Sequence, residues 1–186
     1  MTYRNFKTFS ALALALSVSS AHADLLALNL EPIVGYEQVQ QVLPTPHRLS
    51  RLVYGARATA GILLLSAEAE YTRGVSDESF PDFTQKVTGD RLKVGLRSGF
   101  GLGSLFSIFA RGGVQASQEK VEQNANGEIT TTYQPLVYRP YAGLGARAGL
   151  SNKLSVTANV VAVISDVNDM SQNEYQVTAG FAIRLP

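Results

Sequence analysis

The last twelve residues of the chain, YQVTAGFAIRLP, alternate between apolar side chains and polar or small ones. Successive side chains of a β-strand point to opposite faces, so the alternation predicts a strand that is apolar on one face only. The apolar positions are Tyr175, Val177, Ala179, Phe181, Ile183 and Leu185. A half-buried strand of a soluble sandwich has this pattern, and so does a membrane strand whose apolar face meets lipid.

The alternation occurs in eight segments along the chain. They are residues 28–40, 51–61, 65–73, 90–101, 105–116, 136–150, 154–165 and 175–186. Their lengths of 9 to 15 residues suit a tilted membrane strand, which needs about 9 to 11 residues. They exceed the usual strand of a soluble sandwich, which has about 5 to 6 residues. The lengths therefore favour the membrane strand.

The connections between these segments alternate in length. Long polar connections are expected at residues 41–50, 74–89, 117–135 and 166–173, and short ones at 62–64, 102–104 and 151–153. Long loops on one side of the membrane and tight turns on the other are typical of outer-membrane barrels. The sequence thus predicts an all-β fold, an eight-stranded antiparallel up-and-down transmembrane β-barrel with short periplasmic turns and long extracellular loops.

The first 23 residues have the organisation of a secretory signal peptide. Arg4 and Lys7 precede an apolar run at 9–18, and small residues end the segment at Ala23. The apolar run is too short for a helix that spans a bilayer, which takes about 20 residues. We expect residues 1–23 to be removed and residues 24–186 to form one barrel domain. The mature chain is then nearly neutral and has no cysteine, so we expect no nucleic-acid partner and no disulfide.

Tyrosines recur on the apolar face near the ends of strands that lead to long loops. A tyrosine ring is apolar while its hydroxyl group prefers water, so these residues predict a girdle at the membrane interface. The predicted girdle consists of Tyr36, Tyr54, Tyr71, Tyr138 and Tyr175.

The opposite face carries many charged residues. Its basic residues are Arg51, Arg57, Arg91, Lys93, Arg97, Arg111, Arg139, Arg147 and Arg184, and its acidic residues are Glu31, Glu37, Glu68 and Glu70. Glycines on this face leave room for long side chains, and an unpaired charge in a narrow interior is costly. We therefore predict a paired lumen network of Glu31, Arg57, Glu68, Glu70, Arg97, Arg111 and Arg147. The basic excess of this face would shrink if loop carboxylates, or Glu174 at the rim, turned inward.

Over residues 24–186 the chain resembles the small eight-stranded outer-membrane barrels of the OmpA and OmpX type. Its final strand resembles the carboxy-terminal signal read by the barrel assembly machinery, at Thr178, Gly180, Ile183 and Leu185. The chain departs from that pattern by ending in Leu-Pro where such barrels usually end in an aromatic residue. The resemblance implies a monomer in the outer membrane of a Gram-negative bacterium, in contact with lipopolysaccharide and other outer-membrane lipids.

A fold of this kind does not determine function. We expect a structural or surface-interaction role through the extracellular loops, because eight strands enclose a lumen that side chains can fill. One alternative is a narrow or gated pore that prefers anions, given the basic excess inside. Another is an enzyme that modifies lipid A, and a third is a soluble periplasmic ligand-binding barrel.

The enzyme alternative depends on one histidine. After signal cleavage only His47 remains, in the first long connection, and Ser50 has the opposite strand parity. The two side chains would then not share one face, so we expect no catalytic residues. The acidic loops lack the spacing of a calcium loop and the chain has no nucleotide-binding signature. We accordingly expect no metal and no cofactor.

Overall fold

The computed structural model describes residues 27–41, 47–103, 105–167, 169 and 172–185. The predicted signal peptide lies outside these residues. Within the described part of the chain, no helix has the length and apolar character needed to cross a membrane.

The described residues form nine strands. They are β1 (Ala27–Gln41), β2 (His47–Gly61), β3 (Ser66–Ser79), β4 (Thr84–Leu102), β5 (Phe106–Ala125), β6 (Glu128–Tyr133), β7 (Val137–Gly149), β8 (Leu154–Val163) and β9 (Glu174–Arg184).

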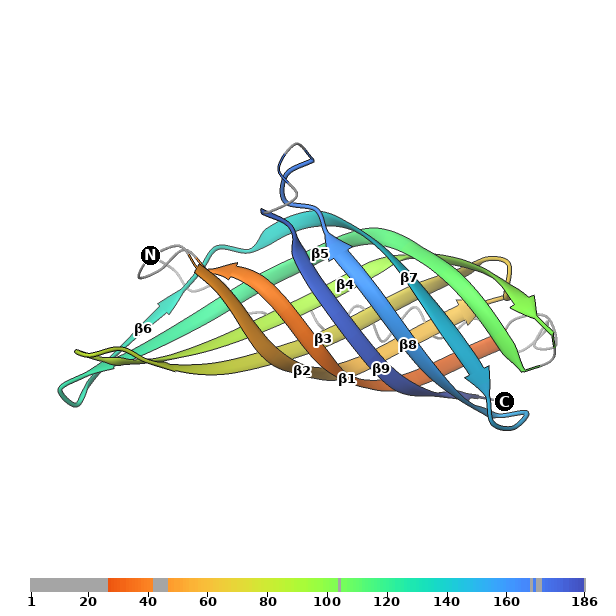
Figure 1. Ribbon diagram of the computed structural model, residues 1–186, viewed down its shortest axis with the longest axis horizontal. Helices are drawn as coiled ribbons and strands as arrows, with labels where there is room; N and C mark the ends of the chain where they lie inside the picture. The colour runs from red at the N-terminus through yellow and green to blue at the C-terminus, as the bar shows by residue number, and fades with distance from the viewer. Residues whose placement is uncertain (1–26, 42–46, 104, 168, 170–171, 186) are drawn as a thin grey trace.

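All neighbouring strands pair in antiparallel fashion, and eight of them form a closed ring. The order β4-β3-β2-β1-β9-β8-β7-β5 is closed by pairing of β4 with β5. The eight-stranded antiparallel barrel predicted from the alternation is therefore confirmed (Figure 1). The remaining strand, β6, pairs with β5 beyond the end of the ring. After an interruption at 134–136 the chain continues as β7, which pairs with β5 within the ring. Pro135, which lacks a backbone N–H, lies in this interruption.

Two of the predicted long loops are wrong in their conformation. Residues 74–89 lengthen β3 and β4, which remain paired up to Ser79 and Thr84. Most of residues 117–135 lengthen β5 and form β6, joined by a tight turn at Asn126 and Gly127 with φ values of 53° and 88°. Two-residue hairpin turns of this kind require positive φ at both positions, and Asn-Gly is the preferred pair.

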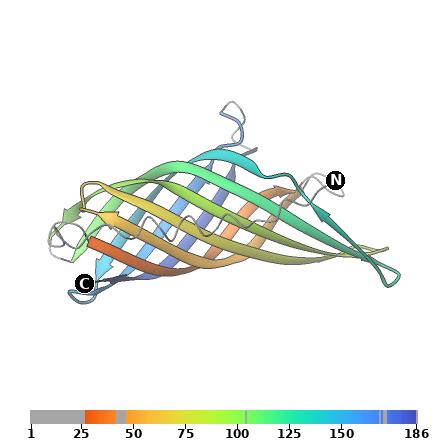
Figure 2. The ribbon, with the colours of Figure 1, turned by 180° about the vertical axis from the view of Figure 1, so that it is seen from behind.

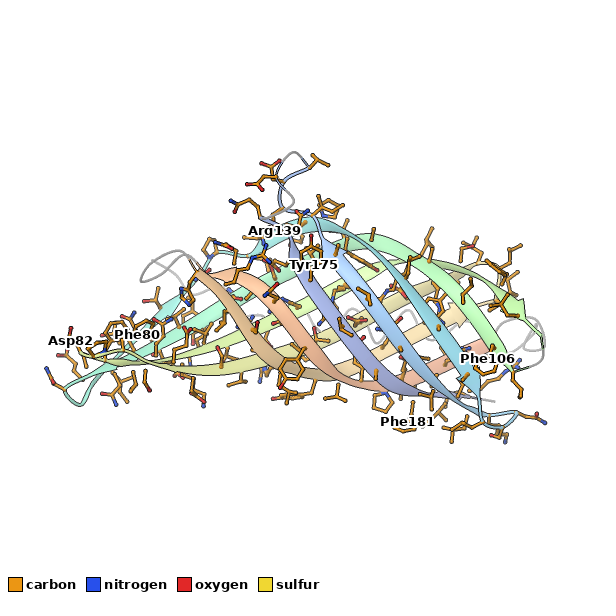
Figure 3. The ribbon with its side chains drawn as sticks, viewed as in Figure 1. Phe80, Asp82, Phe106, Arg139, Tyr175 and Phe181 are labelled. Atoms are coloured by element: carbon orange, nitrogen blue, oxygen red, sulfur yellow. The ribbon has the colours of Figure 1, made fainter. Side chains whose placement is uncertain are left out.

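We use the name protruding sheet for residues 76–79, 84–87, 118–125 and 128–133. Its strands extend past the last pairs that β3 makes with β2 and that β5 makes with β7. Figures 1 and 2 show this sheet reaching away from the ring, at the end opposite the carboxy terminus. In Figure 3, Phe80 and Asp82 mark its tip, and Phe106 and Phe181 lie toward the short-turn end.

The two faces of the barrel wall differ as the alternation predicts. Large apolar side chains such as Leu144, Val160 and Phe181 are exposed on the outer face, with 53% of Val160 accessible. The inner face buries charged and polar side chains, among them Arg57 and Glu70. An exposed apolar belt around a charged interior is the reverse of a soluble protein, and it is the arrangement of a barrel that faces lipid.

Candidate functional site

The barrel interior holds many charged side chains, most of them buried. At mid-height, Glu70 on β3 accepts hydrogen bonds from three basic groups, which lie on the neighbouring strands β2 and β4 and on β5 beyond β4. Its carboxylate oxygens lie 2.6 Å from Arg57 Nη2, 2.7 Å from Lys93 Nζ and 2.9 Å from Arg111 Nη1. All four side chains are almost fully buried. Glu70 is therefore the centre of a buried ion-pair network.

Two further carboxylates complete this middle network. Glu31 Oε1 lies 2.8 Å from Arg57 Nη1, and it also accepts a hydrogen bond from the Thr157 hydroxyl. Glu68 Oε1 lies 2.7 Å from Arg111 Nε and 2.7 Å from the Tyr141 hydroxyl. Each carboxylate thus has a charged donor and a neutral one, which lowers the cost of burying it.

Small residues make room for these groups. At Gly95, a Cβ atom would lie 2.5 Å from the Tyr141 hydroxyl oxygen and 2.2 Å from the Gly112 carbonyl oxygen. At Gly89, a Cβ atom would lie 2.2 Å from Arg51 Nη2. These distances are shorter than real Cβ atoms show. At Gly95 a backbone carbonyl is in the way, so this position requires glycine, whereas at Gly89 a side chain would have to displace the ends of two arginine side chains.

A second ion-pair layer lies toward the long-loop end. Glu37 Oε1 is 2.6 Å from Arg51 Nε and 3.0 Å from Arg91 Nη1. Glu119, from the lengthened part of β5, reaches the same two arginines at 2.7 and 3.1 Å. At the rim, Arg139 Nη1 lies 2.5 Å from Glu174 Oε1. The sequence analysis predicted that Glu119 lies in a loop, and it therefore did not predict this inward contact.

An apolar cluster lies beyond this layer. It consists of Val39 on β1, Leu49 on β2, Val87 on β4 and Val121 on β5, all buried. Val39 and Val121 come from opposite sides of the interior, because β1 and β5 lie four places apart in the ring of eight strands. The described residues therefore narrow the long-loop end of the interior with packed aliphatic side chains.

The short-turn end of the interior is different. Arg97 and Arg147, which we predicted in the paired network, have no carboxylate within 4.0 Å among the described residues, and neither does Arg184. The guanidinium carbon of Arg97 instead lies 3.2 Å from the centre of the Phe109 ring. The structure thus joins Glu31, Arg57, Glu68, Glu70 and Arg111, and leaves two of the seven predicted residues outside the network. Strand parity correctly predicted that both arginines face the interior. They lie nearer the short-turn end than the network, so they do not reach its carboxylates.

His47 begins β2, whereas the sequence predicted that it lies in a loop. Its Nε2 atom is 3.0 Å from Glu78 Oε1 on β3. Ser50 is exposed and has the opposite parity along the strand. The histidine therefore contacts a carboxylate of the neighbouring wall, and the serine points away from it.

The predicted girdle tyrosines all occupy outward positions. Tyr36, Tyr54 and Tyr138 are more than half exposed, Tyr71 is less so, and Tyr175 is partly covered. The hydroxyl group of Tyr71 donates a hydrogen bond of 2.5 Å to Asp90. Their role at a membrane interface stays a prediction.

The predicted assembly signal divides between the two faces of β9 and the residue after it. Thr178 and Gly180 face the interior, where Thr178 accepts a hydrogen bond of 3.4 Å from Arg57. Ile183 and Leu185 are exposed outside. The strand therefore presents the apolar half of the motif on its outer face, and recognition of the motif stays a prediction.

No protein-family model matches the chain, and no curated protein matches its sequence. Solved structures do match. Neisserial surface protein A (NspA) has a TM-score of 0.56 at 11% identity, over 86% of this chain and 97% of that one. The outer membrane protein OprG from Pseudomonas aeruginosa has a TM-score of 0.56 at 11% identity, over 87% of this chain and 96% of that one.

A third match is Ail, the attachment invasion locus protein of Yersinia pestis, in complex with the heparin analogue sucrose octasulfate. Its TM-score is 0.55 at 10% identity, over 85% of this chain and 99% of that one. Each of these chains is covered almost end to end, so the likeness concerns the whole barrel. The fold of this chain is that of the small eight-stranded outer-membrane β-barrels, which confirms the predicted resemblance and agrees with the predicted outer-membrane location.

Proposed function

We propose that the chain is a non-catalytic integral outer-membrane protein that binds other proteins through its protruding sheet. The observation that carries this proposal is the free edge of that sheet. β6 pairs with β5 on one side, and no described strand pairs with its other side. All six residues of β6 are exposed.

An unpaired strand edge is a template for adding another strand, because its backbone N–H and C=O groups lack partners. In a hairpin with a two-residue turn, alternate residues direct these groups toward the partner strand and away from it. Glu128 pairs with Ala125 next to the turn, so Ile129, Thr131 and Tyr133 direct their backbone groups to the free edge. A partner strand would bind there by main-chain hydrogen bonds.

The charge of the protruding sheet limits the kind of partner. Asp77, Asp82, Glu122 and Glu128 outnumber Lys86 and Lys120 on the sheet and its tip. Such a surface repels polyanions and favours neutral or basic partners. The structure of Ail contains a heparin analogue, and we propose that this chain instead binds an extended protein segment.

The interior supports a structural role for the barrel and not a permanent channel. Two ion-pair layers fill the interior from mid-height upward, and the cluster of Val39, Leu49, Val87 and Val121 lies beyond them. We propose that these groups together plug the lumen. The partners of the barrel itself would be outer-membrane lipids including lipopolysaccharide, with the barrel assembly machinery acting during insertion.

The absence of a catalytic role rests on the surroundings of His47. Its ring contacts Glu78, while Ser50 points to the opposite face. A histidine that activates a nucleophile must lie within hydrogen-bond reach of it. We therefore propose that the pair of His47 and Glu78 stabilises the wall and takes no part in chemistry.

The test uses one position on the free edge. Thr131→Pro removes a backbone donor from that edge and leaves pairing with β5 intact, whereas Thr131→Val keeps the donor. Cells that display the wild-type chain should adhere to at least one of three immobilised proteins: fibronectin, laminin or collagen. We expect Thr131→Val cells to adhere equally well and Thr131→Pro cells to fall to the level of cells without the protein.

Heat-modifiable mobility on detergent gels shows that each variant is folded. Adhesion that is the same for Thr131→Pro and wild type would contradict binding at the β6 edge. Wild-type cells that adhere to none of the three proteins better than cells lacking the chain would contradict the proposed function.

A further inference from the structure

We propose that the short-turn mouth of the barrel is a binding site for a small phosphate-bearing anion, held by Arg97, Arg147 and Arg184. This site lies at the opposite end of the molecule from the protruding sheet. It is independent of the surface role proposed above, and it would face the periplasm.

A cavity of about 510 Å³ opens at this end. Arg97, Arg147 and Arg184 line it together with Lys153 from a short turn. None of the described residues that line it is an aspartate or a glutamate. Its remaining polar groups include the side chains of Asn29, Thr59, Ser66, Ser107 and Ser155.

Two of the three arginines have donors without a hydrogen-bond partner, and Arg184 is exposed at the mouth. Arg97 is only 5% exposed, and its guanidinium group stacks on the Phe109 ring. Its Nη1 atom is buried without a hydrogen-bond partner, and the same is true of Arg147 Nε. A buried donor without a partner costs free energy, so both donors are available to a ligand that enters the cavity.

The charge balance of the interior points to the same end. Six basic residues above this cavity meet six carboxylates, those of Glu31, Glu37, Glu68, Glu70, Glu119 and Glu174. Among the residues that the structure describes, Arg97, Arg147 and Arg184 are the inward-parity basic residues that remain. The positive excess is therefore concentrated in one cavity, where like charges repel one another unless an anion enters.

The chemistry of the lining selects the ligand class. A guanidinium group offers planar paired donors that match phosphate oxygens, and hydroxyl and amide groups add neutral donors. Arg97 and Arg147 lie at inward positions of their strands, which separate them from the outer face that meets lipid. A soluble phosphate compound therefore fits better than a phospholipid headgroup, although both have the same chemistry.

The experiment measures binding of pyrophosphate to the protein purified in a non-ionic detergent, by isothermal titration calorimetry at low ionic strength. We expect saturable binding with one pyrophosphate per chain, weakened by salt. Arg147→Gln and Arg184→Gln should each weaken binding about tenfold to a hundredfold, because each removes charged donors. Lys120→Gln, which makes the same charge change on the protruding sheet, should bind like wild type.

A further arm identifies the occupant. Addition of phosphatidylglycerol should leave the pyrophosphate affinity unchanged, and competition would assign the same site to a lipid headgroup. The proposal would be overturned by wild type that does not bind, or by equal affinity of wild type, Arg147→Gln and Arg184→Gln. Heat-modifiable mobility confirms folding independently of each result.

Discussion

The middle and the short-turn end of the barrel interior use the same residue types in opposite ways. At mid-height, Arg57 and Arg111 lie within 3 Å of carboxylates. At the short-turn end, Arg97 and Arg147 have the same inward parity, and no carboxylate of the described residues is within 4.0 Å. Face and residue type therefore do not decide the role of a charged side chain. Its height in the barrel decides which side chains it can reach.

The largest expected effect tests the paired region. The double variant Glu68→Gln plus Glu70→Gln removes the carboxylates that face Arg57, Lys93 and Arg111. Breaking one buried pair costs about 3 to 5 kcal/mol, less where water enters. We therefore expect a fall of at least that order in the unfolding free energy, measured by urea titration in lipid vesicles. We also expect higher anion conductance in planar bilayers.

The control for this variant is Glu122→Gln on the protruding sheet, where Glu122 pairs with Lys120 at 2.7 Å in solvent. Exposed pairs contribute little, so its unfolding midpoint should match wild type. Equal midpoints and equal conductance in the double variant and wild type would show that the network neither supports nor seals the barrel.

We expect a smaller loss of unfolding free energy when a guanidinium group is placed on the outer face of the barrel wall. Val160→Arg and Ala58→Arg put it on the outer face, where lipid supplies neither carboxylates nor water. An arginine at the bilayer midplane of such a barrel costs about 2 to 4 kcal/mol. We expect that loss in vesicle unfolding experiments, with Val160→Leu as the neutral control. Unchanged stability of both arginine variants would mean that this face does not meet lipid.

The smallest effect is expected at the short-turn end. Arg147→Gln removes a charge that makes no ion pair with the described residues and that stands near other arginines. Relief of repulsion should leave the unfolding free energy unchanged or slightly higher. The measurement is the same urea titration in vesicles, without added phosphate. A loss as large as that of Glu68→Gln plus Glu70→Gln would show that this end is also paired, and the contrast between the two regions would disappear.

The alternation in the sequence predicted the strands of the ring, but it did not predict the protruding sheet. Alternation identified all eight ring strands, because one face of each must be apolar. Most of residues 74–89 and 117–135 form strands that extend into solvent. Neither face of such a sheet needs apolar side chains, so these segments lack the alternation and resemble polar loops. Asn126-Gly127 was the signal that could have revealed the second hairpin. The inward contact of Glu119 follows only from that hairpin.

Which side chains face inward follows from the amino-acid sequence, since strand parity depends only on the order of residues. Parity places Glu31, Arg57, Glu68, Glu70 and Arg111 in one interior with Arg97 and Arg147. Which of these side chains meet depends on the three-dimensional arrangement of the strands. Strands in a closed barrel are tilted and staggered against one another, so residues on neighbouring strands are brought level by the register and not by their spacing in the sequence. The same stagger brings Glu119 and Glu174 to the upper arginines and leaves the three lowest arginines facing an open cavity.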